Sequence, residues 1–229
     1  MYRFVYFDLD DTLLDHRSAE RKALADLAVS IWADAAPDHT ADLQSTYHER
    51  NRELWQDYAD GTIGRDRLRE LRFRHVADRF GLDRASWREL DSHYMDCYRK
   101  HWTLIAGAQE AFEAVAARFR VGVITNGFVD VQYSKLARFP FIGECSHAVV
   151  VSEEVGFLKP DSRLFEIARE RAGVSGEELL YIGDSFRSDV MGAVGAGWSA
   201  AWFTDSPTEA LPEGSFAFGE WADLLRRLG

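Results

Sequence analysis

The stretch YRFVYFDLDDT, residues 2–12, decides the fold of this 229-residue chain. Its first half, up to Phe7, is rich in aromatic and β-branched residues, and such a run predicts a strand buried on both faces of a parallel sheet. Its second half places Asp8, Asp10 and Asp11 directly after that strand. The stretch therefore predicts a buried strand that ends at a cluster of carboxylates.

Apolar runs and helical segments alternate in the second half of the chain. The predicted strands cover residues 121–125, 147–151, 179–183 and 199–203, and the predicted helices cover residues 108–118, 162–172 and 188–196. Repeated βα units of this length build a parallel sheet covered by helices. The predicted fold class is therefore α/β, with a Rossmann-like, doubly wound parallel sheet as its core.

Residues 15–103, which have a different sequence pattern, separate the first strand from this repeat. Their segments are strongly charged and carry apolar residues three or four positions apart, as at Leu24 and Leu27, which predicts amphipathic helices. Breaks near Ala36, Gly61 and Asp83 divide the block into about four helices. Short connections between helices are typical of an antiparallel bundle.

Two domains are therefore expected. Residues 1–14 and 104–229 would form the α/β catalytic core, and residues 15–103 would form an inserted α-helical bundle, the cap. Such an insertion next to the edge of a sheet is well placed to close over a site there and exclude water.

The charge balance limits the partners of the chain. The 38 Asp and Glu residues exceed the 27 Lys and Arg residues, which gives a formal net charge of -11. Such an acidic surface repels nucleic-acid phosphates, so no nucleic-acid partner is expected. No apolar run approaches the length of a membrane helix, so no membrane partner is expected either.

The two cysteines, Cys97 and Cys145, form no CxxC pair and have no zinc-ligand spacing. A disulfide framework or structural zinc site is therefore not predicted, and a reducing cytoplasm is the expected location. The sequence gives no indication of oligomeric state.

Polar residues with chemical potential follow several predicted strands. In an open parallel sheet, ligands bind outside the carboxyl ends of the strands, where the strand order reverses. The residues expected at this edge are Asp8 and Asp10, Thr125 and Asn126, Lys159, and Asp184.

The carboxylates at this edge predict a metal site. Of the two carboxylates Asp8 and Asp10, one could attack as a nucleophile and the other could give and take a proton. A lone DxD is, however, more often a solvated turn or a helix cap. Asp184 and Asp189 add two more carboxylates where a helix begins, and Asp189 could partly serve as its cap. Four converging carboxylates would repel one another unless a divalent cation joined them, and hard oxygen ligands favour Mg²⁺.

The remaining polar residues suit an anion such as a phosphoryl group. Lys159 could neutralise its charge, although an isolated lysine is more often an ordinary surface residue. Thr125, Asn126 and Gly127 offer a hydroxyl and backbone N–H groups at the end of a strand. A phosphate-binding site is therefore expected beside the metal.

Taken in order, these motifs resemble those of the haloacid dehalogenase superfamily, in the branch whose cap is inserted after the first strand. The four motifs are DLDDT (residues 8–12), TNG (125–127), KPD (159–161), and GDS (183–185) with Asp189. The resemblance spans nearly the whole chain. The one departure is Ser162, where the family often has a proline, and it concerns helix entry instead of the reacting groups.

The resemblance implies a role for each motif residue. Asp8 would attack phosphorus and form an aspartyl-phosphate, and Asp10 would protonate the leaving oxygen and later activate water. The metal would be held by the Asp8 side chain, the Asp10 backbone carbonyl and Asp184, with Asp189 in the inner or outer shell. Phosphoryl oxygens would be held by Thr125 and the Asn126 N–H, with Gly127 also among the phosphate-binding residues. Lys159 would offset the charge of both Asp8 and the phosphate.

The expected function is thus that of a Mg²⁺-dependent phosphatase, a phosphoric monoester hydrolase acting on a small phosphorylated metabolite. The segments around Gln132 and Lys135 look like those of nucleotidase-type members, which favours a nucleoside monophosphate over phosphoglycolate or a sugar phosphate. Three alternatives stay open: a sugar-phosphate mutase, a haloacid dehalogenase-type hydrolase, and a phosphate-binding module without turnover. Asp10 argues against dehalogenation, because no halide leaving group needs a proton.

Overall fold

The computed structural model describes residues 1–32, 37–82 and 87–229, which form two compact units. One unit combines Met1–Asp15 with Leu104–Gly229, and the other is His16–Thr103. The predicted breaks at Ala36 and Asp83 lie outside the described residues.

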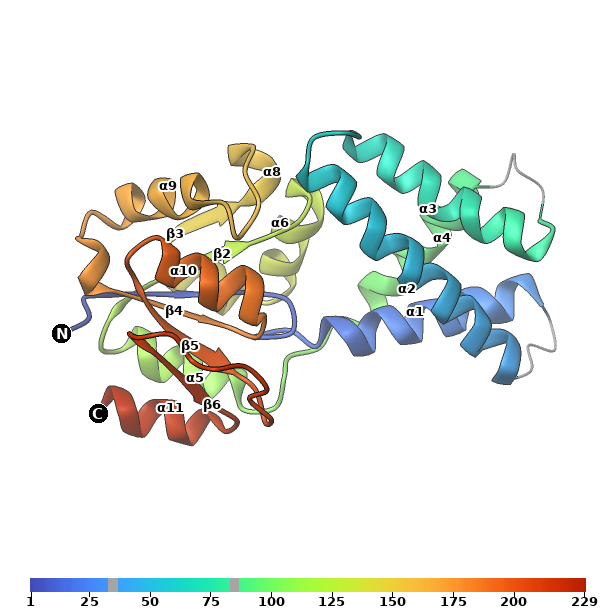
Figure 1. The fold of residues 1–229 in the computed structure, drawn as a ribbon. Coiled ribbons are helices and arrows are strands. Elements are labelled where there is room, and N and C mark those ends of the chain that lie inside the picture. Colours follow the sequence, from blue (N-terminus) through green and yellow to red (C-terminus); the bar gives the residue numbers. More distant parts are fainter. Residues whose placement is uncertain (33–36, 83–86) are drawn as a thin grey trace. The chain divides into compact units, whose positions relative to one another are not determined.

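The first unit is built on a six-stranded sheet, whose neighbouring strands are all parallel (Figure 1). The strands are β1 (Phe4–Phe7), β2 (Arg120–Thr125), β3 (Ser146–Val151), β4 (Leu179–Gly183), β5 (Ser199–Phe203) and β6 (Ser215–Phe218). Their spatial order is β3-β2-β1-β4-β5-β6, so the chain winds away from β1 in both directions. The prediction of a doubly wound parallel sheet is confirmed.

Helices cover both faces of this sheet (Figure 1). They are α5 (Ala108–Ala116), α6 (Val129–Arg138), α7 (Pro140–Cys145), α8 (Ser152–Val155), α9 (Ser162–Ala172), α10 (Met191–Gly195) and α11 (Trp221–Leu228). The apolar side chains of α5, α7 and α11 pack on one face, and those of α9 and α10 pack on the other. The result is a three-layer α/β unit.

Strand β1 shows why the sheet is covered on both sides. Its side chains alternate in direction, so Val5 and Phe7 join one apolar cluster while Phe4 and Tyr6 join the other. All four residues are fully buried. A strand without a polar position is stable only between two layers, as the opening stretch of sequence predicts.

The structure differs from the sequence prediction near the end of the chain. Strand β6 and helix α11 were not predicted, because a four-residue strand and an eight-residue helix give only weak periodic signals. The helix predicted over residues 188–196 begins earlier, with one turn of π-helix at Phe186–Val190 that leads into α10.

The second unit consists of helices that pack against one another. They are α1 (His16–Ile31), α2 (Pro37–Ala59), α3 (Arg65–Phe80) and α4 (Trp87–Lys100). Helix α1 packs on α2 and α4, and α3 also packs on α2 and α4. The predicted break at Gly61 lies between α2 and α3. No helix among the described residues has the length and apolar character needed to cross a membrane.

Candidate active site

The candidate site lies at the carboxyl edge of the sheet, where the strand order reverses. Strands β1 and β4 are hydrogen-bonded neighbours, and Asp8 and Asp184 are the first residues after them. This reversal point is where parallel α/β sheets bind ligands. The topology therefore brings together two carboxylates that are 176 positions apart in the sequence.

The loop after β1 turns sharply and fixes the directions of its aspartates. The Asp8 N–H donates to the carbonyl of Ile182 on β4, at 2.8 Å, which extends the sheet by one residue. Two successive N–H groups, those of Leu13 and Leu14, then donate to the carbonyl of Leu9. Asp11 adopts a left-handed conformation with φ of 60°, which aspartate tolerates better than most residues.

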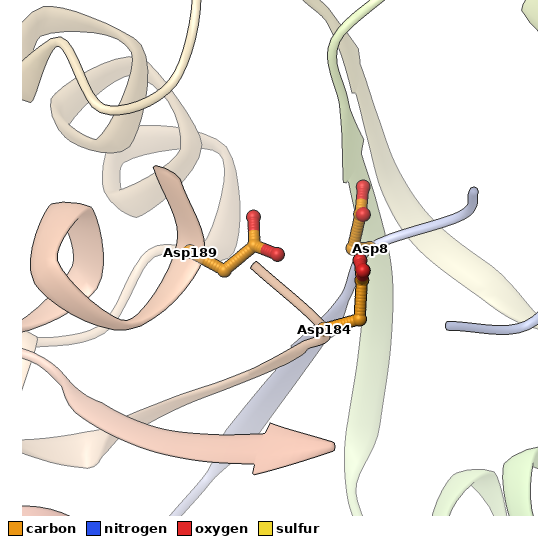
Figure 2. A group of neighbouring side chains, drawn as sticks. All are labelled: Asp8, Asp184 and Asp189. Carbon is orange, nitrogen blue, oxygen red and sulfur yellow. The ribbon is translucent and has the colours of Figure 1, made fainter. Parts of the chain in front are cut away.

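Three carboxylates meet at this edge. Asp8, Asp184 and Asp189 each offer an oxygen, and these oxygens lie within 4.8 Å of one another. Figure 2 shows the Asp189 side chain extending from its own segment toward Asp8 and Asp184. Gly183 leaves room for this approach, because a Cβ there would lie 2.5 Å from Asp189 Cγ. The glycine is thus a requirement of the carboxylate cluster.

Lys159 supplies positive charge to the cluster. Its Nζ lies 2.6 Å from Asp8 Oδ1 and 2.8 Å from Asp189 Oδ1. The same Nζ donates to the hydroxyl of Tyr181, at 2.8 Å, and that hydroxyl donates to the carbonyl of Ile124. Lys159, Asp8 and Asp189 are all buried, so this group of charges is largely removed from water.

Burial shifts the proton equilibria of this group. Burial raises the pKa of Asp8 well above its ordinary value, Lys159 opposes the shift, and the Asp189 and Asp184 carboxylates add to it. For Lys159, burial lowers the pKa, but the attraction of Asp189 and Asp8 outweighs it and the net shift is upward. Lysine is thus held charged, whereas an ionised Asp8 needs further positive charge nearby.

A divalent cation fits this arrangement. When all three carboxylates are ionised, they and the ammonium of Lys159 leave two negative charges at the cluster, and all the ligand atoms are hard oxygens, as Mg²⁺ prefers. Asp189 Oδ1 is buried and makes no hydrogen bond of good geometry with any described residue, although it pairs electrostatically with Lys159. The residues present therefore suit the predicted metal. The Asp10 side chain is not part of this cluster, and its backbone carbonyl stays a predicted ligand.

The TNG segment organises the loop that carries Lys159. The side chain of Asn126 accepts from the Lys159 N–H at 2.8 Å and donates to the Lys159 carbonyl at 3.1 Å. The Gly127 N–H donates to Ser152 Oγ at 3.0 Å, so it already has a partner within the protein. Thr125 is fully buried at the end of β2. Phosphate binding by these three residues stays a prediction.

Two residues of α6 contact Asp10 without having been assigned a role from sequence. Lys135 Nζ lies 2.7 Å from both carboxylate oxygens of Asp10. Gln132 Nε2 donates to Asp10 Oδ2 at 3.0 Å and also to Thr125 Oγ1. Two sequence signals pointed to them: their resemblance to segments of nucleotidase-type members, and their spacing of three positions, which places both on one face of a helix directly after the TNG segment.

The family model for haloacid dehalogenase-like hydrolases matches residues 2–197. The chain is 32% identical over 216 residues to YfnB of Bacillus subtilis, named as a HAD-hydrolase, covering 93% of this chain and 88% of that protein. The crystal structure of YfnB bound to magnesium has a TM-score of 0.81 and 29% identity to this chain, covering 99% of this chain and 98% of the other.

Two further relatives have named activities. The pyrimidine 5'-nucleotidase YjjG of Escherichia coli is 29% identical over 214 residues, covering 92% of this chain and 89% of that protein. The phosphoserine phosphatase of Thermus thermophilus is 32% identical over 237 residues, covering 93% of each chain.

The chain belongs to the family of haloacid dehalogenase-like hydrolases. The sequence-based assignment to this family is confirmed. So is the enzyme class, since the relatives with named activities hydrolyse phosphoric monoesters.

Proposed function

We propose that the protein is a Mg²⁺-dependent phosphatase that transfers the phosphoryl group of a small phosphomonoester to Asp8 and then to water. One observation carries the proposal: the buried Asp8 carboxylate is in contact with Lys159 and clustered with Asp184 and Asp189. The Asp8 carboxylate can act as a nucleophile, because Lys159 and a bound cation would offset the negative charge of the phosphoryl group that it attacks.

The metal would be held by the side chains of Asp8 and Asp184 and by the backbone carbonyl of Asp10, with Asp189 as a direct or outer ligand. When bound, Mg²⁺ offsets the negative charge that builds up on the phosphoryl oxygens. The magnesium in the YfnB structure supports this choice of metal, together with the oxygen-only donor set.

In the first step, an oxygen of Asp8 forms a bond to phosphorus while the bond from phosphorus to the leaving oxygen breaks. Asp10, in its protonated form, gives its proton to that oxygen, the carboxylate that remains pairs with Lys135, and the product alcohol departs. Lys159 carries positive charge next to Asp8, so it can stabilise both the attacking carboxylate and the phosphoryl oxygens. Thr125 and the Asn126 N–H would hold the remaining oxygens, and the Gly127 N–H could join them only by leaving Ser152 Oγ.

In the second step, water attacks the phosphorus of the aspartyl-phosphate. Asp10, now deprotonated, takes a proton from that water, and the bond between phosphorus and the Asp8 oxygen breaks. Inorganic phosphate leaves, and both aspartates return to their starting states. Asp10 thus acts first as an acid and then as a base.

We propose a nucleoside monophosphate as the substrate class, with a pyrimidine base as the first candidate. The name of the Escherichia coli relative supports this choice. Because one relative is a phosphoserine phosphatase, other small phosphomonoesters should also be assayed as substrates. A cytoplasmic location is proposed as well, in keeping with Cys97 and Cys145, which are both free thiols.

Purified protein should be assayed with Mg²⁺ against a panel of nucleoside monophosphates, sugar phosphates, phosphoglycolate and phosphoserine, with released inorganic phosphate as the readout. We expect Asp8→Asn to lower kcat by more than about 10³-fold, because the amide is no nucleophile. Glu144→Gln, which removes an exposed carboxylate from the same unit, should not change kcat. A folded Asp8→Asn protein with near-normal turnover would contradict the mechanism, and isomerised product without phosphate release would indicate a mutase.

A further inference from the structure

Helix α6 presents a pair of buried polar side chains to Asp10. Lys135 is 2% exposed and Gln132 is 1% exposed. Burying the charge of a lysine destabilises the folded state unless a group of opposite charge pairs with it, so a buried Lys135 requires a partner. Both oxygens of the Asp10 carboxylate lie 2.7 Å from Lys135 Nζ, which satisfies the charge.

These contacts restrict the orientation of Asp10. Its side chain is 21% exposed and sits in the turn after β1, where a carboxylate could otherwise rotate about its last bond. A cation that contacts both oxygens, with an amide that donates to one of them, leaves a single orientation with all bonds made. The carboxylate is therefore held by α6 as well as by its own loop.

Gln132 also connects Asp10 to the TNG segment. Its Nε2 contacts Asp10 Oδ2, Thr125 Oγ1 and, at 3.3 Å, the carbonyl of Asn126. Gly127 provides the space for this side chain, because a Cβ there would lie 2.8 Å from Gln132 Nε2. The network thus places the carboxylate of Asp10 in a fixed relation to the end of β2.

We infer that Lys135 and Gln132 are positioning residues that hold the Asp10 carboxylate in the orientation needed for proton transfer to the leaving oxygen. This inference rests on the proposed function, in which Asp10 is the acid. Proton transfer depends steeply on the distance and alignment of donor and acceptor. Loss of Lys135 should therefore matter most when the leaving oxygen needs its proton most.

A pair of matched aryl phosphates separates this effect from a general loss of structure. The phenolate that leaves phenyl phosphate is strongly basic and needs protonation, whereas 4-nitrophenolate leaves readily without it. The quantity to measure is kcat/KM with Mg²⁺ for both esters, which reports phosphoryl transfer from free enzyme and substrate. The variants are Lys135→Met, Gln132→Leu and the control Arg138→Met, which removes an exposed cation from the same helix.

We expect Lys135→Met to lower kcat/KM for phenyl phosphate about 10-fold or more beyond its effect on 4-nitrophenyl phosphate, within the range that acid–base catalysis contributes. Gln132→Leu should show the same split to a smaller extent, and Arg138→Met should show none. Thermal unfolding identifies which variants are folded. If Lys135→Met does not fold, the split in Gln132→Leu decides the matter.

Equal losses on the two esters in folded variants, or no loss, would overturn the inference and indicate a structural role. If the variants lose kcat/KM equally on both esters while the wild type is active and Asp8→Asn is inactive, the proposed function still holds. A wild type that releases phosphate from neither ester nor from the metabolite panel would refute the proposed function itself.

Discussion

The side chain of Asn126 bonds to the backbone of Lys159 on both sides: it accepts from the N–H at 2.8 Å and donates to the carbonyl at 3.1 Å. Lys159 Nζ lies 2.6 Å from Asp8. The end of β2 therefore sets the position of the lysine whose charge the nucleophile needs. This pair links two motifs whose sequence separation is 33 residues.

Asn126→Asp tests that link with a change of one group. The carboxylate can still accept from the Lys159 N–H, but it cannot donate to the Lys159 carbonyl and places a negatively charged oxygen against it, so the loop should shift. We expect kcat to fall about 10- to 100-fold, because displacing a catalytic group by an ångström can cost that much. The measurement is steady-state kinetics with 4-nitrophenyl phosphate, and Asn51→Asp, in the second unit, serves as the control. Unchanged kcat in the Asn126 variant would show that Lys159 is held by its other contacts.

Gly183→Ala should damage the carboxylate cluster. The added Cβ would lie 2.5 Å from Asp189 Cγ, so Asp189 must move, and overpacking of this kind costs about 1–3 kcal/mol of stability. We expect a lower melting temperature and a higher Mg²⁺ concentration for half-maximal activity. Gly195→Ala is the matched control, since nothing lies within 4 Å of a Cβ placed there. Equal behaviour of the two variants would mean that Asp189 adjusts freely.

Mg²⁺ should stabilise the folded protein, because only the folded state gathers the three carboxylates. A ligand at 100 times its Kd adds about 2.7 kcal/mol to the free energy of unfolding. We therefore expect the melting temperature of the wild type to rise with added Mg²⁺ and to fall back with chelator, with activity lost in parallel. Asp184→Asn should weaken this response, whereas Glu144→Gln should keep it. If added Mg²⁺ does not change the melting temperature of the wild type, the proposed metal site is wrong.

The main features of the site could be predicted because they depend on local pattern and one topological rule. A buried apolar run ends where its polar residues begin, which locates Asp8 and Asp184 at strand ends. Parallel strands in this order place such ends together. Neither step requires knowledge of side-chain directions, so the sequence carries this information.

The supporting contacts could not be predicted, since they depend on register and on which side of an element faces the site. Tyr181 lies within an apolar strand, and nothing in the sequence distinguishes its hydroxyl from that of a core tyrosine such as Tyr6. In the sequence, Lys135 cannot be distinguished from the exposed helical lysines Lys22 and Lys100, and only the packing of α6 shows that it is buried. Such roles follow from tertiary structure alone.

The second unit contains a buried carboxylate whose charge depends on pH. Glu20 Oε1 lies 3.0 Å from His48 Nδ1, and Glu20 Oε2 lies 4.0 Å from His16 Nε2. Burial alone would raise the pKa of Glu20, but the hydrogen bond from His48 and the charges of His16, His48 and Arg72 outweigh burial and lower it. For His48, the hydrogen bond to Glu20 raises the pKa, against smaller opposing effects of burial and Arg21.

These opposite shifts give the pair a window of maximal stabilisation. The raised pKa of His48 adds stability that is fully present below the ordinary histidine value of 6.5 and is lost as the pH rises through the folded value. The lowered pKa of Glu20 adds stability that is present above its ordinary value of 4.5 and is lost as the pH falls through the folded value. The pair should therefore stabilise the protein most between these two ordinary values.

His48→Gln tests this window by urea unfolding at pH 5.5 and pH 8.5, values chosen inside it and above it from the ordinary pKa values of the two groups. The wild type should exceed the variant in free energy of unfolding at the lower pH, by about 1 kcal/mol or less because His48 is partly exposed to solvent. The difference should shrink at the higher pH, because the stabilisation from the raised pKa of His48 is lost as the pH rises through the folded value. His75→Gln, at an exposed position of α3, should show no such dependence. A difference that is constant with pH would mean that His48 acts through packing alone, because packing does not titrate.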